Sequence, residues 1–241
     1  MSGYTDATYG DRIAGVYDAL YDSYDEQAVA TLAELAGDGP ALELGIGTGR
    51  IALPLQARGV AVHGIDASQL MVDRLRAKPG GERIPVAIGD FASVPVEGAF
   101  SLIYVVFNTF FALLTQEKQV QCFASVSRHL APGGVFALEG FVPDMTRYRS
   151  RQNMQLISMD EDELRFDASL LNPVDQTILS QHAFLREEGV RLYPVRLRYA
   201  WPAELDLMAR LAGLRLLHRW SDWRRSPFTA EATKHISVYG V

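Results

Sequence analysis

The stretch Ala41-Leu42-Glu43-Leu44-Gly45-Ile46-Gly47-Thr48-Gly49-Arg50 decides the fold of this chain. An apolar run ends in glycines at alternate positions and an amphipathic segment follows, which is the pattern of a parallel strand that turns tightly into a helix. Glycine at such a turn lets backbone N–H groups approach a ligand without a Cβ in the way. The N-terminus of the next helix adds unpaired donors and partial positive charge. The stretch therefore predicts a ligand site at the carboxyl end of a parallel strand.

Acidic residues end the next two predicted strands. Residues 60–66 predict the second strand, and Asp66 follows Gly45 by about 20 residues, the spacing at which a carboxylate accepts hydrogen bonds from ribose hydroxyls. Residues 84–91 predict the third strand, with Asp90 at its tip. Because the carboxyl ends of parallel strands lie at one edge of the sheet, the glycine turn, Asp66 and Asp90 predict a nucleoside pocket.

This ordered set of segments resembles the class I S-adenosylmethionine-dependent methyltransferases, and within them the enzymes that modify small molecules of secondary metabolism. Residues 43–49 are similar to the E/D-x-G-x-G-x-G motif of that family, residues 64–66 to its second motif, and residues 89–91 to its adenine-contacting turn. Residues 130–134, Leu-Ala-Pro-Gly-Gly, resemble the turn before its fifth strand. The resemblance implies S-adenosyl-L-methionine as methyl donor and S-adenosyl-L-homocysteine as product.

Further site positions follow from this resemblance. The segment Val16-Tyr17-Asp18-Ala19-Leu20-Tyr21 is similar to the Y-D-x-x-Y segment that folds over the cofactor in many small-molecule methyltransferases. Its two tyrosines, four positions apart, equally fit the core-facing side of a helix. The residues that the resemblance assigns to cofactor binding are Tyr17, Tyr21, Glu43, Gly45, Ile46, Gly47, Thr48, Gly49, Asp66, Ala67, Gly89, Asp90, Phe91, Val106 and Phe107.

Two other functions stay open for the glycine turn. A dinucleotide site has the fingerprint G-x-G-x-x-G/A, whereas here the third glycine comes one residue early and Arg50 stands where Gly or Ala allows close helix–strand packing. An NAD(P)-dependent oxidoreductase is therefore the weaker alternative. A non-catalytic nucleoside-binding regulator with the same fold is the other.

Strands and helices alternate through residues 37–141, which predicts a parallel sheet with helices on both faces. After Asp144 the alternation stops, and period-two segments between residues 154 and 200 predict an antiparallel insertion over the carboxyl end of the sheet. Strands are predicted at residues 41–46, 60–66, 84–89, 100–107, 134–141, 214–217 and 235–239, and helices at 49–57, 68–77, 116–129 and 202–212.

The fold class expected from this order is α/β, a Rossmann-like doubly wound sheet of seven mostly parallel strands with an antiparallel β cap. The resemblance implies that the last strand lies antiparallel between the fifth and the sixth. The polar residues 1–10 predict a flexible start. The expected single domain consists of one or two helices over the cofactor (12–36), a cofactor-binding core (37–141), a substrate cap (142–200) and a last helix with two strands (201–241).

The composition limits the partners. The 241 residues carry a net charge of −6, which argues against nucleic acid because binding it requires a basic surface. The chain shows no N-terminal signal and no apolar run of about 18 residues, so we expect a cytoplasmic protein that does not bind membranes. Cys122 is the single cysteine, and no His/Cys/Asp cluster has metal-ligand spacing. A small-molecule methyl acceptor, no metal, and a monomer or homodimer are expected.

Methyl transfer from a sulfonium displaces a neutral thioether, so the protein mainly aligns nucleophile, methyl and sulfur and excludes water. A general base is needed only for a nucleophile that is protonated at the working pH. His182 in the cap is the best base candidate, and Asn108 after the fourth strand could orient a polar nucleophile, whether O, N or C accepts the methyl. Residues that could face the acceptor, if they do not simply pack in the core, are Asn108, Phe111, Glu139, Phe141, His182 and Tyr199.

The substitution Asp66→Ala should weaken the binding of S-adenosylhomocysteine by roughly 2–4 kcal/mol, because both ribose hydroxyls are expected to donate to this charged, partly buried acceptor. Isothermal titration calorimetry measures the dissociation constant. An unchanged constant would remove Asp66 from the site.

Overall fold

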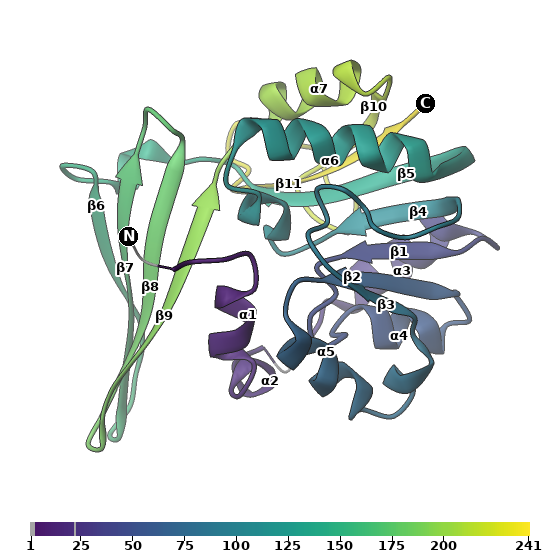
Figure 1. Ribbon diagram of the computed structural model, residues 1–241. Coiled ribbons are helices and arrows are strands. Elements are labelled where there is room, and N and C mark those ends of the chain that lie inside the picture. The colour runs from purple at the N-terminus through teal and green to yellow at the C-terminus, as the bar shows by residue number, and fades with distance from the viewer. Residues whose placement is uncertain (1–2, 22) are drawn as a thin grey trace.

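The computed structural model describes residues 3–21 and 23–241, which form two β-sheets with helices between and around them (Figure 1). Strand β11 runs antiparallel to both of its neighbours, and the other neighbouring strands of the larger sheet, sheet A, are parallel, which confirms the predicted fold class. In spatial order sheet A contains β10 (Arg215–Trp220), β11 (Lys234–Gly240), β5 (Leu130–Phe141), β4 (Phe100–Val105), β1 (Ala41–Leu44), β2 (Val62–Asp66) and β3 (Val86–Ile88).

Two apolar clusters bury the faces of sheet A. Along β4, Ile103 and Val105 point into one cluster and Leu102 and Tyr104 into the other, as expected for a parallel strand covered on both sides. Helices α6 (Gln116–His129) and α7 (Pro202–Leu211) supply the first cluster, and α3 (Glu26–Ala36), α4 (Ala52–Ala57) and α5 (Gln69–Arg76) supply the second. Short 3₁₀ turns lie at Gly81–Arg83, Thr109–Ala112 and Met145–Arg147.

The helix boundaries follow from local chemistry. The side chain of Thr115 accepts a hydrogen bond from the Lys118 N–H at 3.2 Å and begins α6 as predicted. Helix α7 begins at Pro202, and Gly213 follows it with φ +77°, the left-handed conformation that ends helices. The helix predicted at residues 49–57 is shorter, because Gly49 has φ +79° and cannot be helical, so that Pro54 falls in the first turn of α4.

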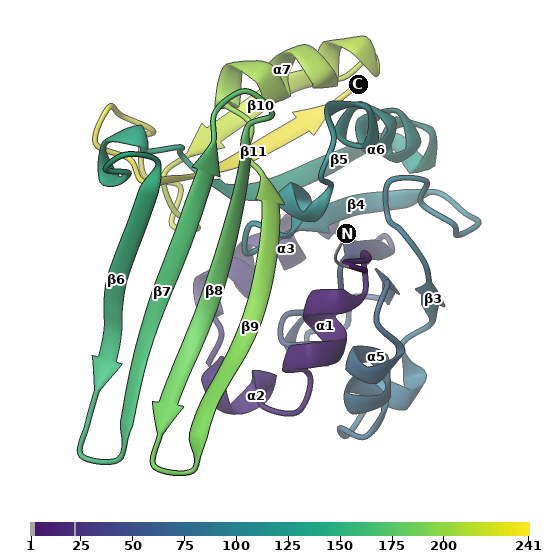
Figure 2. The same ribbon diagram turned by 60° about the vertical axis from the view of Figure 1, so that its left-hand side comes forward.

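Sheet B is the predicted insertion. Its four antiparallel strands are β6 (Gln152–Met159), β7 (Glu163–Asn172), β8 (Thr177–Arg186) and β9 (Gly189–Arg198), in that spatial order (Figure 2). The last of these strands begins at Gly189 and pairs with β8 along its whole length. The pairing of β7 with β8 sets Asp167 opposite His182.

The N-terminal segment differs from its prediction. Of the predicted flexible start, residues 1 and 2 lie outside the described residues, and helix α1 already begins at Thr8. Instead of one or two helices, three are present: α1 (Thr8–Ile13), α2 (Tyr17–Leu20) and α3. Helix α1 lies between the two sheets, where Ile13 and Ala14 form a small cluster with Met71 of α5 and Tyr193 of β9 (Figure 1).

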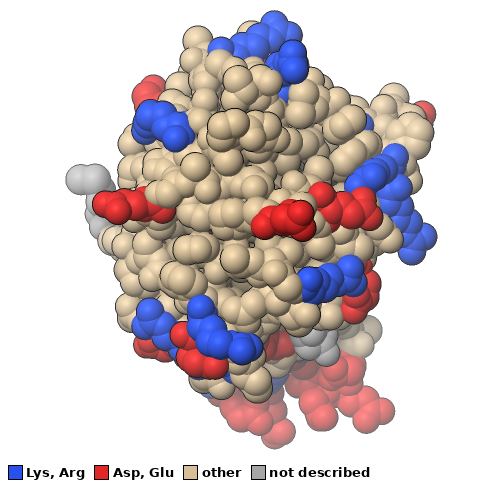
Figure 3. Space-filling view, turned by 90° about the vertical axis from the view of Figure 1, so that its right-hand side faces the viewer, with Lys and Arg blue, Asp and Glu red and all other residues tan. Residues whose placement is uncertain are grey.

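Figure 3 shows the side of the molecule that faces away from sheet B. Lys and Arg groups lie near Asp and Glu groups around an area of other residues, so the described part of this face carries no continuous strip of one charge. Among the residues that the structure places, no helix is long and apolar enough to cross a membrane. No group of three or more His, Cys, Asp or Glu side chains within the same residues is arranged to hold a metal ion.

His235 on β11 predicts a pH dependence of stability. Its side chain is fully buried beside Ser237, and burial, reinforced by the Arg219 charge, lowers its pKa from 6.5 to about 4. Between these values the unfolded chain binds a proton that the folded chain does not, so the free energy of unfolding falls as the pH falls. From pH 7 to pH 5 this group alone should cost about 2 kcal/mol.

Urea unfolding of the wild type and of His235→Gln at pH 7 and pH 5 measures this contribution. The variant should lose about 2 kcal/mol less than the wild type between the two values, since glutamine does not titrate. His218→Gln on the exposed face of β10 is the matched control and should keep the wild-type dependence. Equal pH dependence in wild type and His235→Gln would contradict the assignment.

Candidate functional site

In the turn after β1, every second residue is a glycine with positive φ: Gly45 at +75°, Gly47 at +56° and Gly49 at +79°. A Cβ on Gly45 would lie 2.4 Å from Thr109 Cγ2, and one on Gly49 would lie 2.3 Å from Leu75 Cδ1, so these two glycines allow close packing. A Cβ on Gly47 would meet only a methyl group at 3.5 Å. Gly47 is therefore the glycine of the turn that faces open space.

Asp66 ties the tips of β1 and β2 together. Its Oδ2 accepts a hydrogen bond from the Gly47 N–H at 2.7 Å, and its Oδ1 accepts one from the Ser68 N–H at 2.9 Å. Burial raises the pKa of this carboxyl, and the two backbone donors oppose the rise. The carboxylate therefore sits at the strand tips in a place where further donors or a cation stabilise its charged form.

Glu43, on β1 beneath the turn, is a second buried acid. Its side chain is 3% exposed and accepts a hydrogen bond from the Tyr104 hydroxyl at 3.0 Å. Burial raises its pKa to about 8, against the opposing effects of the Tyr104 hydrogen bond and the Arg50 charge. Glu43 is buried and Asp66 is partly buried on the adjacent strand, so a positive charge bound near them would stabilise the ionised form of each carboxyl.

Helices α1 and α2 are fastened over the turn by polar contacts. Asp18 of α2 accepts hydrogen bonds from the Thr48 hydroxyl at 2.6 Å and from Lys78 Nζ at 2.8 Å. Asp11 of α1 accepts one from the Ser68 hydroxyl at 2.6 Å. We call α1, α2 and these contacts the N-terminal cover.

The turn, the cover and sheet B enclose a cavity of about 360 Å³, which we call the turn cavity. Its floor comes from the tips of β1, β2 and β4, and its roof from the N-terminal tyrosines and from β8 and β9. Phe91 and Met71 add apolar wall, whereas Glu43 and Asp66 add acidic groups. A cavity with this mixture suits a nucleoside that carries a positive charge.

His182 reaches the turn cavity from β8. Its Nδ1 lies 2.5 Å from Asp167 Oδ1 on the neighbouring strand β7. A carboxylate at that nitrogen fixes the tautomer with the proton on Nδ1, which leaves Nε2 as the acceptor. The pair has the geometry of an oriented general base.

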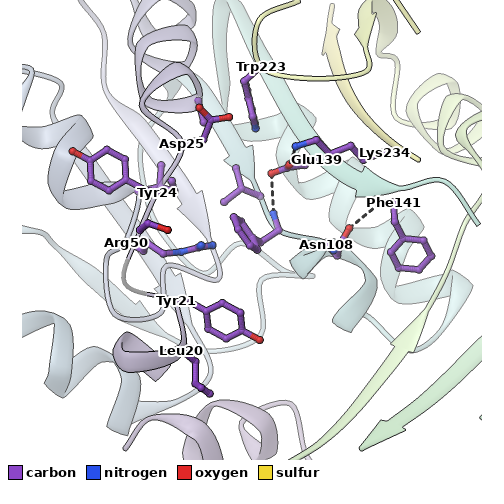
Figure 4. A pocket seen from close by; sticks show the side chains of 15 residues that line it. Leu20, Tyr21, Tyr24, Asp25, Arg50, Asn108, Glu139, Phe141, Trp223 and Lys234 are labelled. Carbon is purple, nitrogen blue, oxygen red and sulfur yellow. Dashed lines mark hydrogen bonds and ion pairs between the residues drawn. The ribbon is translucent and has the colours of Figure 1, made fainter. Parts of the chain in front are cut away.

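Figure 4 shows a second cavity of about 560 Å³, the Glu139 cavity, which shares Arg50, Phe107 and Asn108 with the wall of the turn cavity. In the wall the Arg50 guanidinium carbon lies 3.4 Å from the centre of the Phe107 ring, a close cation–π contact. Phe107 and Asn108 have φ of +58° and +65°, a conformation that strains residues other than glycine. Glu139 accepts from the Phe107 N–H at 3.1 Å and pairs with Lys234 at 3.1 Å, and so holds this turn in place.

Most of the predicted site residues lie together. Asn108 borders both cavities, but its Oδ1 accepts a hydrogen bond from the Phe141 N–H at 2.7 Å, so this oxygen positions backbone. Predicted residues on the wall of the turn cavity are Tyr17, Tyr21, Glu43, Gly45, Ile46, Gly47, Thr48, Asp66, Ala67, Phe91, Val106, Phe107, Asn108 and His182. Those on the wall of the Glu139 cavity are Tyr21, Val106, Phe107, Asn108, Glu139 and Phe141.

Five predicted residues do not line either cavity among the residues described. Gly49 packs against Leu75 and Leu53, which explains why it is small without facing a ligand. The Asp90 carboxylate pairs with Lys118 at 2.7 Å and accepts a hydrogen bond from the Ala92 N–H. It therefore stabilises the turn in which it lies. Phe111 is fully buried against Phe110 and Phe141 in the core. The remaining two are Gly89 and Tyr199.

Residues that act through contacts with distant parts of the chain carry no local sequence signal, so the sequence does not predict them. Asp18 was part of the noted tyrosine segment, but its partners lie 30 and 60 positions away in the chain. No local pattern singles out Asp167, because its place opposite His182 depends on the register of the hairpin. In the sequence, Arg50 only argues against a dinucleotide site, whereas in the structure its side chain lines both cavities.

Comparisons relate the chain to known proteins. A family model for a methyltransferase domain matches residues 41–134. The structure of the CcbJ methyltransferase from Streptomyces caelestis shares 39% sequence identity, covers 98% of both chains and has a TM-score of 0.90. The structure of S-adenosylmethionine-bound CalS10, an amino pentose methyltransferase from Micromonospora echinaspora, shares the fold at 20% identity, with a TM-score of 0.70 over 94% of this chain and 97% of its own. The cypemycin N-terminal methyltransferase of a Streptomyces species is 28% identical over 200 residues, 82% of this chain and 81% of its own.

The substitution Gly47→Val should lower the affinity for S-adenosylhomocysteine more than tenfold, because it places a branched side chain on the wall of the turn cavity. The left-handed backbone at this position also costs a non-glycine residue roughly 1–2 kcal/mol of stability. Gly59→Val is the matched control, since Gly59 has φ +92° and open space around it outside the cavity. Similar melting temperatures with loss of binding in Gly47→Val alone are expected in thermal melts and calorimetry. Near-normal affinity in Gly47→Val would show that the turn does not face the ligand.

Proposed function

Because this chain belongs to the S-adenosylmethionine-dependent methyltransferases, with S-adenosylmethionine as methyl donor, we propose that its acceptor is an amine of a small molecule and that His182 removes the proton from that amine. Methyltransferase activity on small molecules follows from the family. The nucleophile and the base are the new elements of the proposal. The observation that supports them best is the His182–Asp167 pair on the wall of the turn cavity.

The turn cavity fits the donor. Asp66 offers a carboxylate to ribose hydroxyls at the tip of β2, and the open space at Gly47 allows backbone contact. Phe91 supplies an apolar ring on the same wall. The bound donor would supply a methyl group on a sulfonium, and such a cation would favour the ionised forms of Glu43 and Asp66, whose pKa values burial raises.

An amine acceptor requires a base, and His182 can supply it. Ammonium groups are protonated at neutral pH and have no lone pair, so attack on a methyl group requires prior loss of a proton. Nε2 of His182 accepts that proton, and Asp167 stabilises the imidazolium that forms. The neutral amine then forms the new N–C bond as the C–S bond breaks, and the thioether leaves without needing an acid.

The comparison with the cypemycin N-terminal methyltransferase supports an amine acceptor, since that relative acts on an N-terminus and aligns over most of this chain. The inner face of sheet B also suits this task, because it presents His182, Tyr193 and Asp167 toward the cover. We therefore assign residues 142–200 to acceptor recognition and residues 37–141 to the donor. The cover, formed by α1 and α2, borders both.

The acceptor class is tested by release of S-adenosylhomocysteine with a matched panel of small primary and secondary amines, alcohols and phenols. Turnover is expected with amines. Methyl transfer to oxygen or carbon acceptors alone would contradict the proposal, whereas the family assignment would stand.

The substitution His182→Ala should lower kcat by roughly 10²–10⁴-fold and remove the acid limb of the pH–rate profile. Affinity for S-adenosylhomocysteine should change by no more than about 0.5 kcal/mol, since the site of proton transfer is separate from the donor contacts. Asp167→Asn, which retains the shape of the side chain, should lower kcat with the donor affinity retained. His218→Ala on β10 serves as control. A His182→Ala enzyme that keeps the wild-type acid limb would exclude this histidine as the base.

A further inference from the structure

The turn after β4 is strained, and its own packing does not explain why. Phe107 and Asn108 follow one another with φ of +58° and +65°, a conformation that costs free energy for residues other than glycine. The Phe107 ring is 48% exposed, so its burial offsets only part of that cost. Such a conformation persists only where the surrounding structure holds it from several sides. The groups that hold this turn therefore keep the wall of both cavities in shape.

Two hydrogen bonds join this turn to β5 in opposite directions. The Phe107 N–H donates to Glu139 Oε2 at 3.1 Å, and the Phe141 N–H donates to Asn108 Oδ1 at 2.7 Å. Glu139 and Phe141 lie two positions apart and therefore on one face of the strand. Strand β5 supplies a side chain to one bond and its backbone to the other (Figure 4). The strained turn is thus tied to a strand in the interior of sheet A.

Lys234 of β11 holds Glu139 in turn. Glu139 is 7% exposed, and an unpaired carboxylate is costly in such a place. Lys234 Nζ donates to Glu139 Oε1 at 3.1 Å, so each carboxylate oxygen has a donor. The strand pairing sets Lys234 opposite Phe141, which places it diagonally from Glu139, within reach of a long side chain. Charge and hydrogen bonds together fix the Glu139 side chain.

The far side of the turn touches the glycine turn. Phe107 and Asn108 lie on the wall of the turn cavity, and a Cβ on Gly45 would lie 2.4 Å from Thr109 Cγ2. Glu139 lines the Glu139 cavity but is not among the described residues on the wall of the turn cavity. We propose that Glu139 and Lys234 are positioning residues for the donor. Through the Phe107 N–H they hold the turn against the turn cavity, and so they set how slowly the bound nucleoside leaves.

The wall between the two cavities links this hold to release. The Arg50 guanidinium carbon lies 3.4 Å from the centre of the Phe107 ring, so the position of the ring sets that of Arg50. Without Glu139 the strain at Phe107 relaxes, the ring moves and the wall between the cavities opens. Changes in a binding site mostly alter the dissociation rate constant and leave the association rate constant nearly unchanged. This inference depends neither on an amine acceptor nor on His182.

Stopped-flow binding of S-adenosylhomocysteine to the full chain tests the proposal without an acceptor. Glu139→Leu removes the partner of the Phe107 N–H and should raise the dissociation rate constant roughly tenfold or more, the effect of losing a hydrogen bond to a charged group. Glu139→Gln keeps an oxygen for that N–H and should stay within about threefold of the wild type. The association rate constant should change little in either variant.

Lys234→Met is the second variant, and it changes only a partly exposed side chain. It leaves the Glu139 carboxylate without its cation, so the dissociation rate constant should rise about threefold or more. Combined with Glu139→Leu it should add nothing, because Lys234 acts through Glu139. Glu163→Leu on β7 is the matched control and should keep the wild-type rate constant. Glu163 is 9% exposed and pairs with Arg165 and Arg186, but it is not among the described residues that line either cavity.

Hydrogen exchange of the backbone amides of residues 104–112, measured with S-adenosylhomocysteine bound, separates positioning from a general loss of stability. Exchange in this segment should be faster in Glu139→Leu and unchanged in Glu139→Gln. A folded Glu139→Leu variant with the wild-type dissociation rate constant would overturn the proposal. Equal rate constants in the leucine and glutamine variants, or effects of Glu139→Leu and Lys234→Met that add, would also overturn it.

Melting temperatures show whether each variant is folded. Should Glu139→Leu fail to fold, Lys234→Met and Glu139→Gln decide, and a wild-type dissociation rate constant in Lys234→Met would then overturn the proposal. None of these results bears on the amine acceptor or on the base, which are tested by turnover.

Discussion

The hydrogen bond from the Gly47 N–H to the Asp66 carboxylate joins the tips of the two strands on which the site is built. It requires a left-handed glycine in the turn after β1 and an acid at the end of β2, the neighbouring strand in sheet A. The same carboxylate accepts a hydrogen bond from the Ser68 N–H at the start of α5. The Ser68 hydroxyl in turn donates to Asp11 of α1. Through Ser68, the Asp66 carboxylate therefore helps to position helix α1 of the cover.

Much of the fold was predictable because its signals are local. Strands of sheet A are continuous apolar runs, and helix α6 begins at a threonine that caps it. The order of the strands came from the resemblance, since periodicity alone does not say which strands are neighbours. Alternation along β7 predicted a sheet with two different faces, but it could not say which face would point inward. The answer depends on the packing of Tyr193 against α1, a contact between distant parts of the chain.

A site residue was predictable where its residue type at that position serves ligand binding better than it serves packing. Gly47 and Asp66 lie where the sequence placed them, on the wall of the turn cavity. Gly49 and Phe111 lie on neither cavity wall, because a small or an aromatic residue near a strand tip can also serve packing, here against Leu75 and Phe141. His182 was found as a lone histidine, whereas its partner Asp167 needed the register of a hairpin.

The cover has a kinetic consequence. Two ion pairs at or next to the cover join partly exposed groups: Asp18 with Lys78 and, just before α1, Asp6 with Lys118. Such contacts each contribute little, typically about 0–1 kcal/mol, and salt screens the charged ones. The apolar contacts of α1, through Ile13 and Ala14, form a much smaller cluster than those that cover sheet A. Lifting α1 and α2 should therefore cost less than opening sheet A, and the backbone amides of these helices should exchange with solvent by local opening. Because residues of the cover line the turn cavity, access to that cavity should depend on this local opening, at a rate that changes with ionic strength.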